Sequence, residues 1–401
     1  MYYARETVKK LKESRQIVIF GAGLVAREVA FCLMGEPYGL ELECFLVSDR
    51  EGNPAYISNL PVLDLKEGKA RIGKDALIVV SVLEKYLDEV CEKLREYGFE
   101  HILPMTFESD RWSLIRGNAY RHFCLSRGKS HRTLEEELRS VCVPGEAEQE
   151  EGSPRSTPGL RACRAAAGEG DAEPAVRVYR AVCHVDRPLQ EDLSRYRWEI
   201  PIQVGAALTK ERICELRDNQ GDNISHKNRQ YCELTALYWI WKHDTSAYAG
   251  FCHYRRHFEL NEKMLRQLAY SDIDVVLTIP VLNVPSVEAV YRHDHVGRDW
   301  EVMMEAVRIL APDYMASAQE LQNGNFYYAY NMVIARKKIL DDYCAWLFPI
   351  LQYCEERCGE REGIYQERYL GFLAERLMGI YFLKHEDTYK IVHARKHFVK
   401  G

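Results

Sequence analysis

Residues 16–105 alternate short apolar runs with segments in which apolar residues recur at helical spacing. Glycine or polar residues follow each apolar run, which is typical of buried strands joined to helices. This alternation predicts a small α/β unit with a mostly parallel sheet. The expected strands are residues 17–20, 44–47, 76–82 and 101–103, and the expected helices are residues 24–34 and 87–97.

The same alternation returns after residue 176, now with longer helical segments. We therefore expect a second α/β domain in this part of the chain. Its expected strands are residues 178–184, 248–252, 273–279 and 330–335, and its expected helices are residues 231–242, 300–310, 339–356 and 365–383.

Residues 143–175 have a different composition, rich in Pro, Gly, Glu and Ala and almost free of large apolar side chains. Such a segment cannot bury enough surface to offset its chain entropy, so we expect a disordered linker, preceded by a short helix at 134–141. The expected organisation is a Rossmann-like nucleotide-binding domain at 1–125, a helix and disordered linker at 126–175, and an α/β domain at 176–401.

Composition narrows the class of protein. The chain has 401 residues, of which 47% are hydrophobic and 28% are charged, so we expect a soluble globular protein. Its net charge of −6 argues against broad nucleic-acid binding. The 13 cysteines are scattered and form no CxxC pair, which favours reduced thiols in a cytoplasm over a zinc site. No run approaches the ~20 apolar residues that span a bilayer, and the charged N-terminal residues lack the apolar core expected of a signal sequence.

The first apolar run is followed by Gly21-Ala22-Gly23-Leu24-Val25-Ala26, which fits GxGxxA between a strand and a helix, and Asp49 follows the next strand. This context predicts a dinucleotide-type site for NAD or another nucleotide, formed by Gly21, Gly23, Ala26 and Asp49. The alternative is a degenerate unit that binds no ligand and serves as an interaction module. The sequences IVIFGAG, FLVSD and LPVL resemble the small N-terminal nucleotide-binding domain of some bacterial sugar-modifying enzymes.

In the second domain, the expected strand at 248–252 runs directly into His253-Tyr254-Arg255-Arg256-His257. Guanidinium groups stay charged and pair bidentately with phosphate oxygens, so this edge suits a phosphate or diphosphate. We therefore expect His253, Arg255 and Arg256 to bind the diphosphate of a ligand and to act in catalysis there. The alternative is a basic surface turn.

The polar loop at 218–228 precedes an aromatic helix whose apolar stripe is expected in the core. Asp218, Asp222, Asn223 and Lys227 are candidates for binding donor hydroxyl and phosphate groups. The alternative is a turn that caps the helix, because Asp, Asn and Ser favour caps and turns. Glu233, on that helix, is expected to pair with Arg255 or Arg256.

Three further candidates lie toward the C-terminus. The cluster His293, His295 and Asp299 has no common metal-ligand spacing, and we interpret it as an active-site loop over donor or acceptor. Glu375 lies on an apolar helix beside Arg376 and is a candidate base for the acceptor hydroxyl. The alternative is a structural Glu375–Arg376 network with Arg368. Asn331 is a candidate contact of the donor sugar.

Six motifs resemble one family in the family's order: PIQVGAAL, DNQGDNISHKN, YCELTALYWIWK, GFCHYRRHF, YNMVIARKKILDDYCAWLF and GFLAERL. The family is the glycosyltransferase domain, long catalogued as a domain of unknown function, of bacterial capsule and exopolysaccharide gene clusters. The resemblance covers residues 177–398. It implies a GT-A-like nucleotide-sugar transferase fold, and family members tend to carry a His and an Asp in the region 293–299. Gln203 in the first motif is a further candidate for donor binding, and Arg376 joins His293, His295 and Asp299 as a candidate for the acceptor site or lid.

The resemblance implies transfer from a UDP-hexose, or from UDP-galactofuranose as in some members that look like galactofuranosyltransferases, to a lipid-linked polysaccharide acceptor. We expect a cytoplasmic enzyme with peripheral contact at the inner face of the plasma membrane. Its C-terminal basic residues are candidates for meeting anionic lipids, or they form an ordinary solvated tail. These residues are Lys390, Arg395, Lys396, His397 and Lys400.

The motif His253-Tyr254-Arg255 stands where many GT-A enzymes have a metal-binding Asp-x-Asp pair. We therefore expect metal-independent transfer, with Mn²⁺ or Mg²⁺ as the alternative. Two other function classes stay open. One is an NAD-dependent sugar-nucleotide oxidoreductase, although this chain has no Tyr-x-x-x-Lys at the expected distance after the third strand. The other is a non-catalytic nucleotide-sugar binding module.

Overall fold

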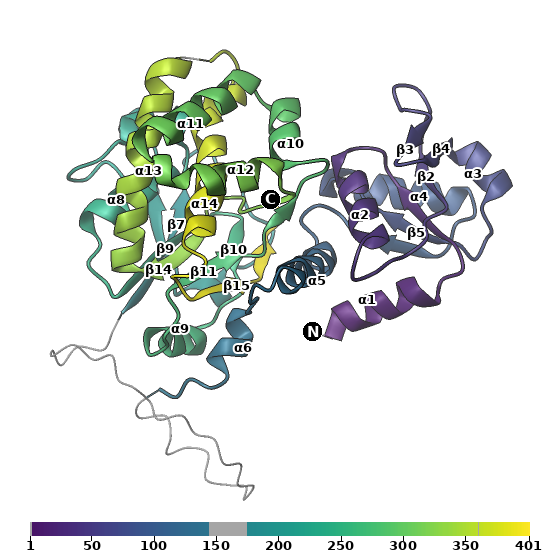
Figure 1. Cartoon of the computed structure of the whole chain (residues 1–401), viewed down its shortest axis with the longest axis horizontal. Helices are drawn as coiled ribbons and strands as arrows, with labels where there is room; N and C mark the ends of the chain where they lie inside the picture. The colour runs from purple at the N-terminus through teal and green to yellow at the C-terminus, as the bar shows by residue number, and fades with distance from the viewer. Residues whose placement is uncertain (1, 144–174, 360) are drawn as a thin grey trace, which may run out of the picture. The chain divides into compact units, whose positions relative to one another are not determined.

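A computed structural model describes residues 2–143, 175–359 and 361–401. The chain divides into two compact units, one formed by residues 1–130 with 280–290 and the other by residues 131–279 with 291–401 (Figure 1). Most of the expected linker, residues 144–174, lies outside the described residues. The short helix expected before it is present as α6 (Leu134–Leu138), and it belongs to the second unit.

The first unit contains a six-stranded sheet in the order β3-β4-β2-β1-β5-β6. All neighbours are parallel except β3, which pairs antiparallel with β4. The parallel part has the doubly wound order, with its switch point between β1 and β5. The strands are β1 (Ile17–Phe20), β2 (Cys44–Val47), β3 (Tyr56–Ile57), β4 (Leu60–Asp64), β5 (Leu77–Val80) and β6 (Ile102–Pro104), with β12 (Val281–Leu282) in the later segment.

The central strands of this sheet are buried on both faces, which explains their continuous apolar sequences. The α/β class expected for this unit is confirmed. Three helices of this unit, α1, α3 and α5, were not predicted from the sequence, although α3 begins with a complete capping box between Asp64 and Glu67. The helices are α1 (Tyr2–Glu13), α2 (Leu24–Met34), α3 (Leu65–Arg71), α4 (Leu87–Glu96) and α5 (Asp110–Ser126).

The second unit contains an eight-stranded mixed sheet in which β9 pairs with β7, β10 and β14. β7 is parallel to β8 and β9, and antiparallel β14 lies between β9 and β11. The carboxyl ends of β7, β8, β9 and β11 therefore share one edge, at which β14 begins. The strands are β7 (Val176–Val182), β8 (Ile200–Gln203), β9 (Tyr248–His253), β10 (Arg256–Phe258), β11 (Val275–Thr278), β14 (Val333–Arg336), β15 (Ile391–Ala394) and β16 (Lys396–Phe398), with a short β13 (Phe326–Tyr327) outside this sheet.

Helices α11, α12, α13 and α14 pack together over this sheet (Figure 1). The α/β class expected for the second unit is confirmed, and in the described part of the chain no helix is both long and apolar enough to cross a membrane. The bounds are α7 (Asn228–Tyr231), α8 (Leu234–His243), α9 (Glu262–Ala269), α11 (Gly297–Leu310), α12 (Met315–Asn323), α13 (Lys337–Cys358) and α14 (Tyr369–Lys384), and α10 (Val287–Asp294) spans the boundary of the two units in sequence.

Two local features of the second unit shape the edge that β9 reaches. Gly250 lies in β9 so close to β14 that a side chain there would collide with the backbone of Val333 and Ile334. The helix expected at 231–242 is broken at Cys232, whose φ of 50° is left-handed. The Asn228 side chain donates to the Cys232 carbonyl at 2.6 Å and holds this break between α7 and α8.

Candidate functional site

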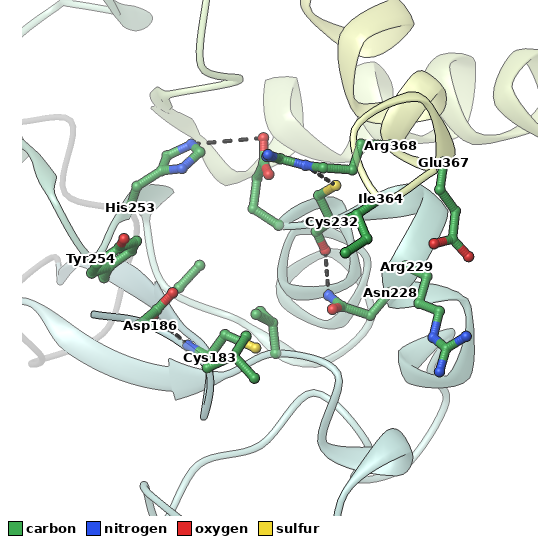
Figure 2. Close-up of a pocket in the computed structure, with 14 residues that line it drawn as sticks. Cys183, Asp186, Asn228, Arg229, Cys232, His253, Tyr254, Ile364, Glu367 and Arg368 are labelled. Carbon is green, nitrogen blue, oxygen red and sulfur yellow. Dashed lines mark hydrogen bonds and ion pairs between the residues drawn. The ribbon is translucent and has the colours of Figure 1, made fainter. Parts of the chain in front are cut away.

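A cleft of about 580 Å³ opens where β7 and β9 end (Figure 2). This is the edge at which open α/β sheets generally bind ligands. Its walls come from the end of β7 and the loop after it, from α7 and the break that follows, from the end of β9, and from the segment before α14. The lining residues are Ala181, Cys183, Val185, Asp186, Val204, Asn228, Arg229, Cys232, Glu233, His253, Tyr254, Ile364, Glu367 and Arg368.

The strand-end motif, residues 253–257, lies partly in the cleft and partly outside it. His253 and Tyr254 line the cleft. The Arg255 guanidinium lies 5.1 Å from the Tyr254 ring and 5.3 Å from the Phe398 ring. The Arg256 guanidinium lies 4.4 Å from the ring of Tyr330. Both arginines therefore stack on aromatic rings, and neither is among the lining residues.

His253 holds the beginning of the neighbouring strand in place. Its Nε2 lies 2.5 Å from the Tyr330 carbonyl oxygen and 3.7 Å from a carboxylate oxygen of Glu233. Because a carbonyl oxygen only accepts, Nε2 carries the proton of this hydrogen bond. Burial lowers the pKa of His253, while the Glu233 carboxylate opposes that shift. His253 thus acts here as a neutral donor to the backbone.

Tyr330 and Asn331 form a left-handed turn beside the cleft, with φ values of 71° and 53°. The Tyr330 N–H donates to Glu375 at 2.7 Å, and the Asn331 amide donates to Glu233 at 2.9 Å and to the Gly371 carbonyl at 3.2 Å. A left-handed Tyr costs free energy, and such residues persist where surrounding contacts fix them, often at functional sites. Glu233, expected to pair with Arg255 or Arg256, contacts Asn331 and His253.

Glu375 lies behind this turn, outside the set of cleft-lining residues. One carboxylate oxygen accepts from Tyr330, and the other accepts from Arg376 Nη1 at 2.8 Å. Burial raises the pKa of Glu375, and Arg376 opposes that shift. Arg376 is itself buried between the rings of Tyr327 and Tyr291. This geometry is the structural Glu375–Arg376 network that the sequence left as an alternative.

The cations that line the cleft are two arginines that the sequence analysis did not place at the diphosphate, Arg229 on α7 and Arg368 just before α14. Both side chains are exposed. Arg368 Nε donates to the Cys232 sulfur at 3.2 Å, and Cys232 and nearby carboxylates raise the pKa of Arg368. In Figure 2, Arg229 and Glu367 lie across the cleft from Asp186 and Tyr254.

Asp186 is a cleft-lining carboxylate in the loop after β7. It accepts a hydrogen bond of 2.6 Å from the Cys183 backbone N–H. Burial raises the pKa of Asp186 to about 6, while the Cys183 N–H, Arg255 and His184 act in the opposite direction. A carboxyl group with this pKa can exchange a proton near neutral pH. Asp186 was not a candidate from the sequence, because no motif surrounds it.

Asp218 and Gln203 organise the loops after β8. Asp218 is fully buried and accepts from the backbone N–H groups of Gly205 and Ala206, at 2.8 and 3.1 Å, and from the Ser225 hydroxyl at 2.5 Å. Gln203 is also fully buried, and its amide bonds the backbone of residues 211 and 213. These contacts satisfy both side chains within the protein.

The other candidates of the polar loop also have protein partners. Asp222 is exposed and accepts from the Tyr238 hydroxyl at 3.2 Å. Asn223 bonds the Gly221 carbonyl and the Ser225 N–H, which is the geometry of a turn. Lys227 pairs with Glu355 at 2.7 Å. The structure therefore supports the turn-and-cap alternative for this loop, and none of these three residues lines the cleft.

Residues 293–299 form the end of α10 and the start of α11. His293 is exposed beside Asp294, and Asp299 is fully buried in an ion pair with Arg361. His295 stacks on Phe372 with ring centroids 4.1 Å apart, and burial lowers its pKa to about 3. These residues lie outside the lining set and do not converge on one another.

A buried group beneath the strand-end motif has metal-ligand residue types but does not fit a metal. Glu199, Cys252 and His257 bring ligand atoms within 4.8 Å of one another. His257 Nδ1 faces both carboxylate oxygens of Glu199 at 3.0 and 2.9 Å, and its Nε2 faces the Tyr254 carbonyl at 3.2 Å. Arg180 lies 3.4 Å from the same carboxylate. These contacts occupy the ring nitrogens and hold the turn that carries Tyr254.

In the first unit, the glycine motif lies at the carboxyl ends of β1 and β2. Gly21 has a φ of 119°, and an added Cβ would lie 2.8 Å from the Ser81 carbonyl oxygen and 3.2 Å from the Ala26 Cβ. Gly23 begins α2 with open space around it. Asp49 is exposed, and its carboxylate accepts from the Glu51 N–H at 2.9 Å. Gly21 and Gly23 thus lie in the turn between β1 and α2, and Asp49 follows β2.

Comparison with known proteins identifies the family of the second unit. The profile of a domain of unknown function, DUF4422, matches residues 181–386. The chain belongs to the DUF4422 family. All the residues that line the cleft lie within this DUF4422 segment, and so does the left-handed turn beside it.

This chain is also similar to a solved structure described as the apo structure of the WbbM bifunctional glycosyltransferase. The identity is 29%, the TM-score is 0.48, and the match covers 57% of this chain. It covers 46% of the WbbM chain, so this chain spans less than half of that length. A comparison with curated proteins gave no match.

Proposed function

We propose that the second unit transfers a sugar from a nucleotide-sugar donor to a glycan acceptor in the cleft at the ends of β7 and β9. One observation carries the proposal. In the segment that carries the six ordered motifs resembling a glycosyltransferase domain, the sheet edge forms a cleft lined by Arg229, Arg368 and the Asp186 carboxyl group, whose pKa burial raises to about 6. The arrangement of parallel β7, β8 and β9 beside antiparallel β14 supports a GT-A-like fold.

Sugar transfer makes three demands on such a site. The bond from the sugar C1 to a phosphate oxygen breaks, a bond from the acceptor oxygen to C1 forms, and the acceptor proton moves to a base. Positive charge at the departing diphosphate lowers the barrier, and guanidinium groups supply it with bidentate geometry. We assign this role to Arg229 and Arg368, because their exposed side chains line the cleft.

His253, Arg255 and Arg256 then act one step further from the donor. His253 fixes the Tyr330 carbonyl, and the two guanidinium groups stack on rings that border the cleft. In this proposal they position Tyr254 and the left-handed turn, and their charges add to the field at the diphosphate. Asn331 borders the same turn and is retained as a candidate contact of the donor sugar.

Two carboxyl groups compete for the role of base. Both oxygens of Glu375 are hydrogen-bonded within the protein, and the residue lies behind Tyr330. Asp186 lines the cleft and accepts one backbone hydrogen bond of 2.6 Å. Because a base needs a free lone pair within reach of the acceptor hydroxyl, we propose Asp186.

We also propose transfer that needs no metal, with Mn²⁺ or Mg²⁺ as the alternative that the test below decides. The donor is proposed to be a UDP-hexose or UDP-galactofuranose, and the acceptor a lipid-linked glycan of capsule or exopolysaccharide synthesis. Contact with the inner membrane face and a cytoplasmic location belong to the same proposal. The support for them is the family resemblance of the motifs.

For the first unit, we propose nucleotide binding at Gly21, Gly23 and Asp49. The doubly wound strand order and the close approach of Gly21 to Ser81 at the β1–β5 switch point favour it. An NAD-dependent oxidoreductase would need a substrate site at this same edge. A thermal-shift screen of dinucleotides and nucleotide sugars on the full chain and its Gly23 variants separates these possibilities from a unit without a ligand.

The experiment for the second unit is acceptor-dependent release of UDP from a panel of UDP-hexoses, measured on the full chain with EDTA and with added Mg²⁺ or Mn²⁺. We expect turnover with one donor in EDTA, lost in Arg368→Ala. Turnover only with a divalent ion would refute metal independence. Donor binding without turnover for every acceptor glycan tested would favour a non-catalytic binding module instead.

A further inference from the structure

The most exposed large apolar side chains of the second unit lie at the mouth of its cleft. Ile364 is 87% exposed and Val185 is 73% exposed, and both line the cleft. Tyr365, next to Ile364, is 54% exposed. Single exposed apolar residues are ordinary on protein surfaces. Here, however, two segments far apart in the sequence bring such residues to the same opening, which indicates an interaction surface.

Cationic side chains accompany these apolar tips. Arg187 follows Val185 by two positions, and Arg368 follows Ile364 by four. Arg229 also lines the cleft. All three arginine side chains are exposed. Apolar tips interleaved with basic groups are the composition by which proteins bind the interface of a bilayer that carries anionic lipids.

This pattern fits a bilayer better than a protein partner. A stable protein interface buries roughly 800 Å² of continuous surface on each side. The apolar tips here come from two separate segments at the opening, and those segments also carry the charged residues Arg187, Glu367 and Arg368. A bilayer interface can accept separate tips one by one, because each enters the headgroup region beside its own anionic neighbours.

The C-terminal basic residues are a poorer surface for lipid, because acidic side chains already neutralise them. Lys390 bridges Asp272 and Glu137 at 2.6 and 2.5 Å. Arg395 pairs with Glu135 and Glu259 at 2.9 and 3.0 Å. His397 pairs with Glu191, and Lys396 is buried. These ion pairs remove most of the charge that the sequence had suggested for lipid contact.

We propose that the cleft rim contacts a bilayer containing anionic lipids. We define the rim by its apolar residues Val185, Ile364 and Tyr365 and its cations Arg187, Arg229 and Arg368. The inference rests on the proposed function only in that it would place the opening of the cleft against a membrane-anchored acceptor. Binding itself needs neither donor nor acceptor, so it can be measured without any transfer.

The test is co-sedimentation of the full chain with phosphatidylcholine vesicles that contain or lack phosphatidylglycerol, without sugar substrates. We expect binding that needs phosphatidylglycerol and weakens with salt. Val185→Glu with Ile364→Glu should lower the partition coefficient at least about tenfold. The matched control is Ile309→Glu with Leu310→Glu, at the end of α11, where the wild-type side chains are 53% and 48% exposed. It should bind as wild type.

Each outcome decides the inference. Equal binding by the rim variant and wild type, or no binding to vesicles with phosphatidylglycerol, overturns it. A loss caused by Lys390→Glu with Arg395→Glu, but not by the rim variant, assigns the contact to the C-terminal residues instead. Ile364→Ser, a milder change, should give a smaller loss and guards against misfolding of the double variant. Vesicle binding by a chain without transferase activity would keep this inference and refute the proposed function.

Discussion

The two sheets of this chain each present a carboxyl edge suited to a ligand, but they build it in opposite ways. In the first unit the edge is one local segment, in which Gly21 packs against Ser81 and Gly23 leaves open space at the start of α2. In the second unit the cleft is assembled from four segments, and its polar side chains come from the ends of β7 and β9, α7 and the segment before α14.

The difference lies in what supplies the chemistry. Backbone N–H groups and the absence of side chains define the first edge, so a short fingerprint contains nearly all of it. Side chains from distant segments define the second. A strand-end motif can mark that edge, yet which of its residues face the cleft depends on the rings around it, such as Tyr330 and Phe398.

We expect the largest effect on transfer from removing the two cations that line the cleft, Arg229 and Arg368. We expect Arg368→Ala and Arg229→Ala each to lower kcat/KM for UDP-hexose transfer by about 10²–10³-fold, because each removes positive charge from the departing diphosphate. Acceptor-dependent UDP release measures this. Arg368→Lys, which keeps charge without the bidentate geometry, should recover part of the loss.

The matched comparison is Arg255→Ala, in which a ring-stacked guanidinium is removed. If its loss exceeds that of Arg368→Ala and Arg229→Ala together, the diphosphate lies at the strand-end motif, as the sequence first suggested.

The same contrast explains how much of the fold and of the site could be predicted from the sequence. The α/β class and the strands β1, β2, β9, β11 and β14 follow from apolar runs, because burial on both faces imposes them. Asp218 could not be assigned from the sequence, since its partners Gly205 and Ala206 are backbone groups of a separate loop. Arg229 and Asp186 lie in no motif, and only the folded edge brings them to one cleft.

The next largest effect concerns the pH dependence of kcat/KM, which reports the proton accepted by the proposed base. If Asp186 is the base, kcat/KM should fall tenfold per pH unit below about 6, because its raised pKa leaves the carboxyl protonated there. Asp186→Asn should lose about 10²-fold or more at neutral pH and abolish this acid limb. A pH–rate profile measures both.

Arg255 opposes the upward shift in the pKa of Asp186, so Arg255→Met should move the limb to higher pH. Other titratable or charged groups line the cleft, namely His253, Glu233, Glu367, Arg229 and Arg368, and His184 interacts with Asp186 from the same loop. An acid limb that persists unchanged in Asp186→Asn assigns the titration to one of these and refutes the proposed base.

A smaller effect on turnover is expected at Glu375. In Glu375→Gln the side-chain oxygen can still accept the Tyr330 N–H, so kcat/KM should change only a few-fold, while the unpaired Arg376 lowers thermal stability. Glu375→Ala, which also frees the turn, should cost more. A 10³-fold loss in a fully folded Glu375→Gln would return the base role to Glu375.

The smallest effect on transfer should come from the first unit, where a matched pair of substitutions separates backbone strain from site chemistry. Gly21→Ala places a Cβ 2.8 Å from the Ser81 carbonyl oxygen at a φ of 119°, so it should lower the free energy of unfolding of this unit by about 1–3 kcal/mol. Gly23→Ala makes the same chemical change at a φ of −75° with open space around it, so it should cost less than about 1 kcal/mol.

Denaturant unfolding of the full chain measures both, and UDP release should stay at the wild-type value in each. A Gly21→Ala chain that keeps its stability would show that the backbone approach to Ser81 is not needed. A Gly23→Ala chain that loses UDP-hexose transfer, with both units folded, would contradict this contrast. The glycine edge of the first unit would then contribute to the reaction in the cleft of the second unit.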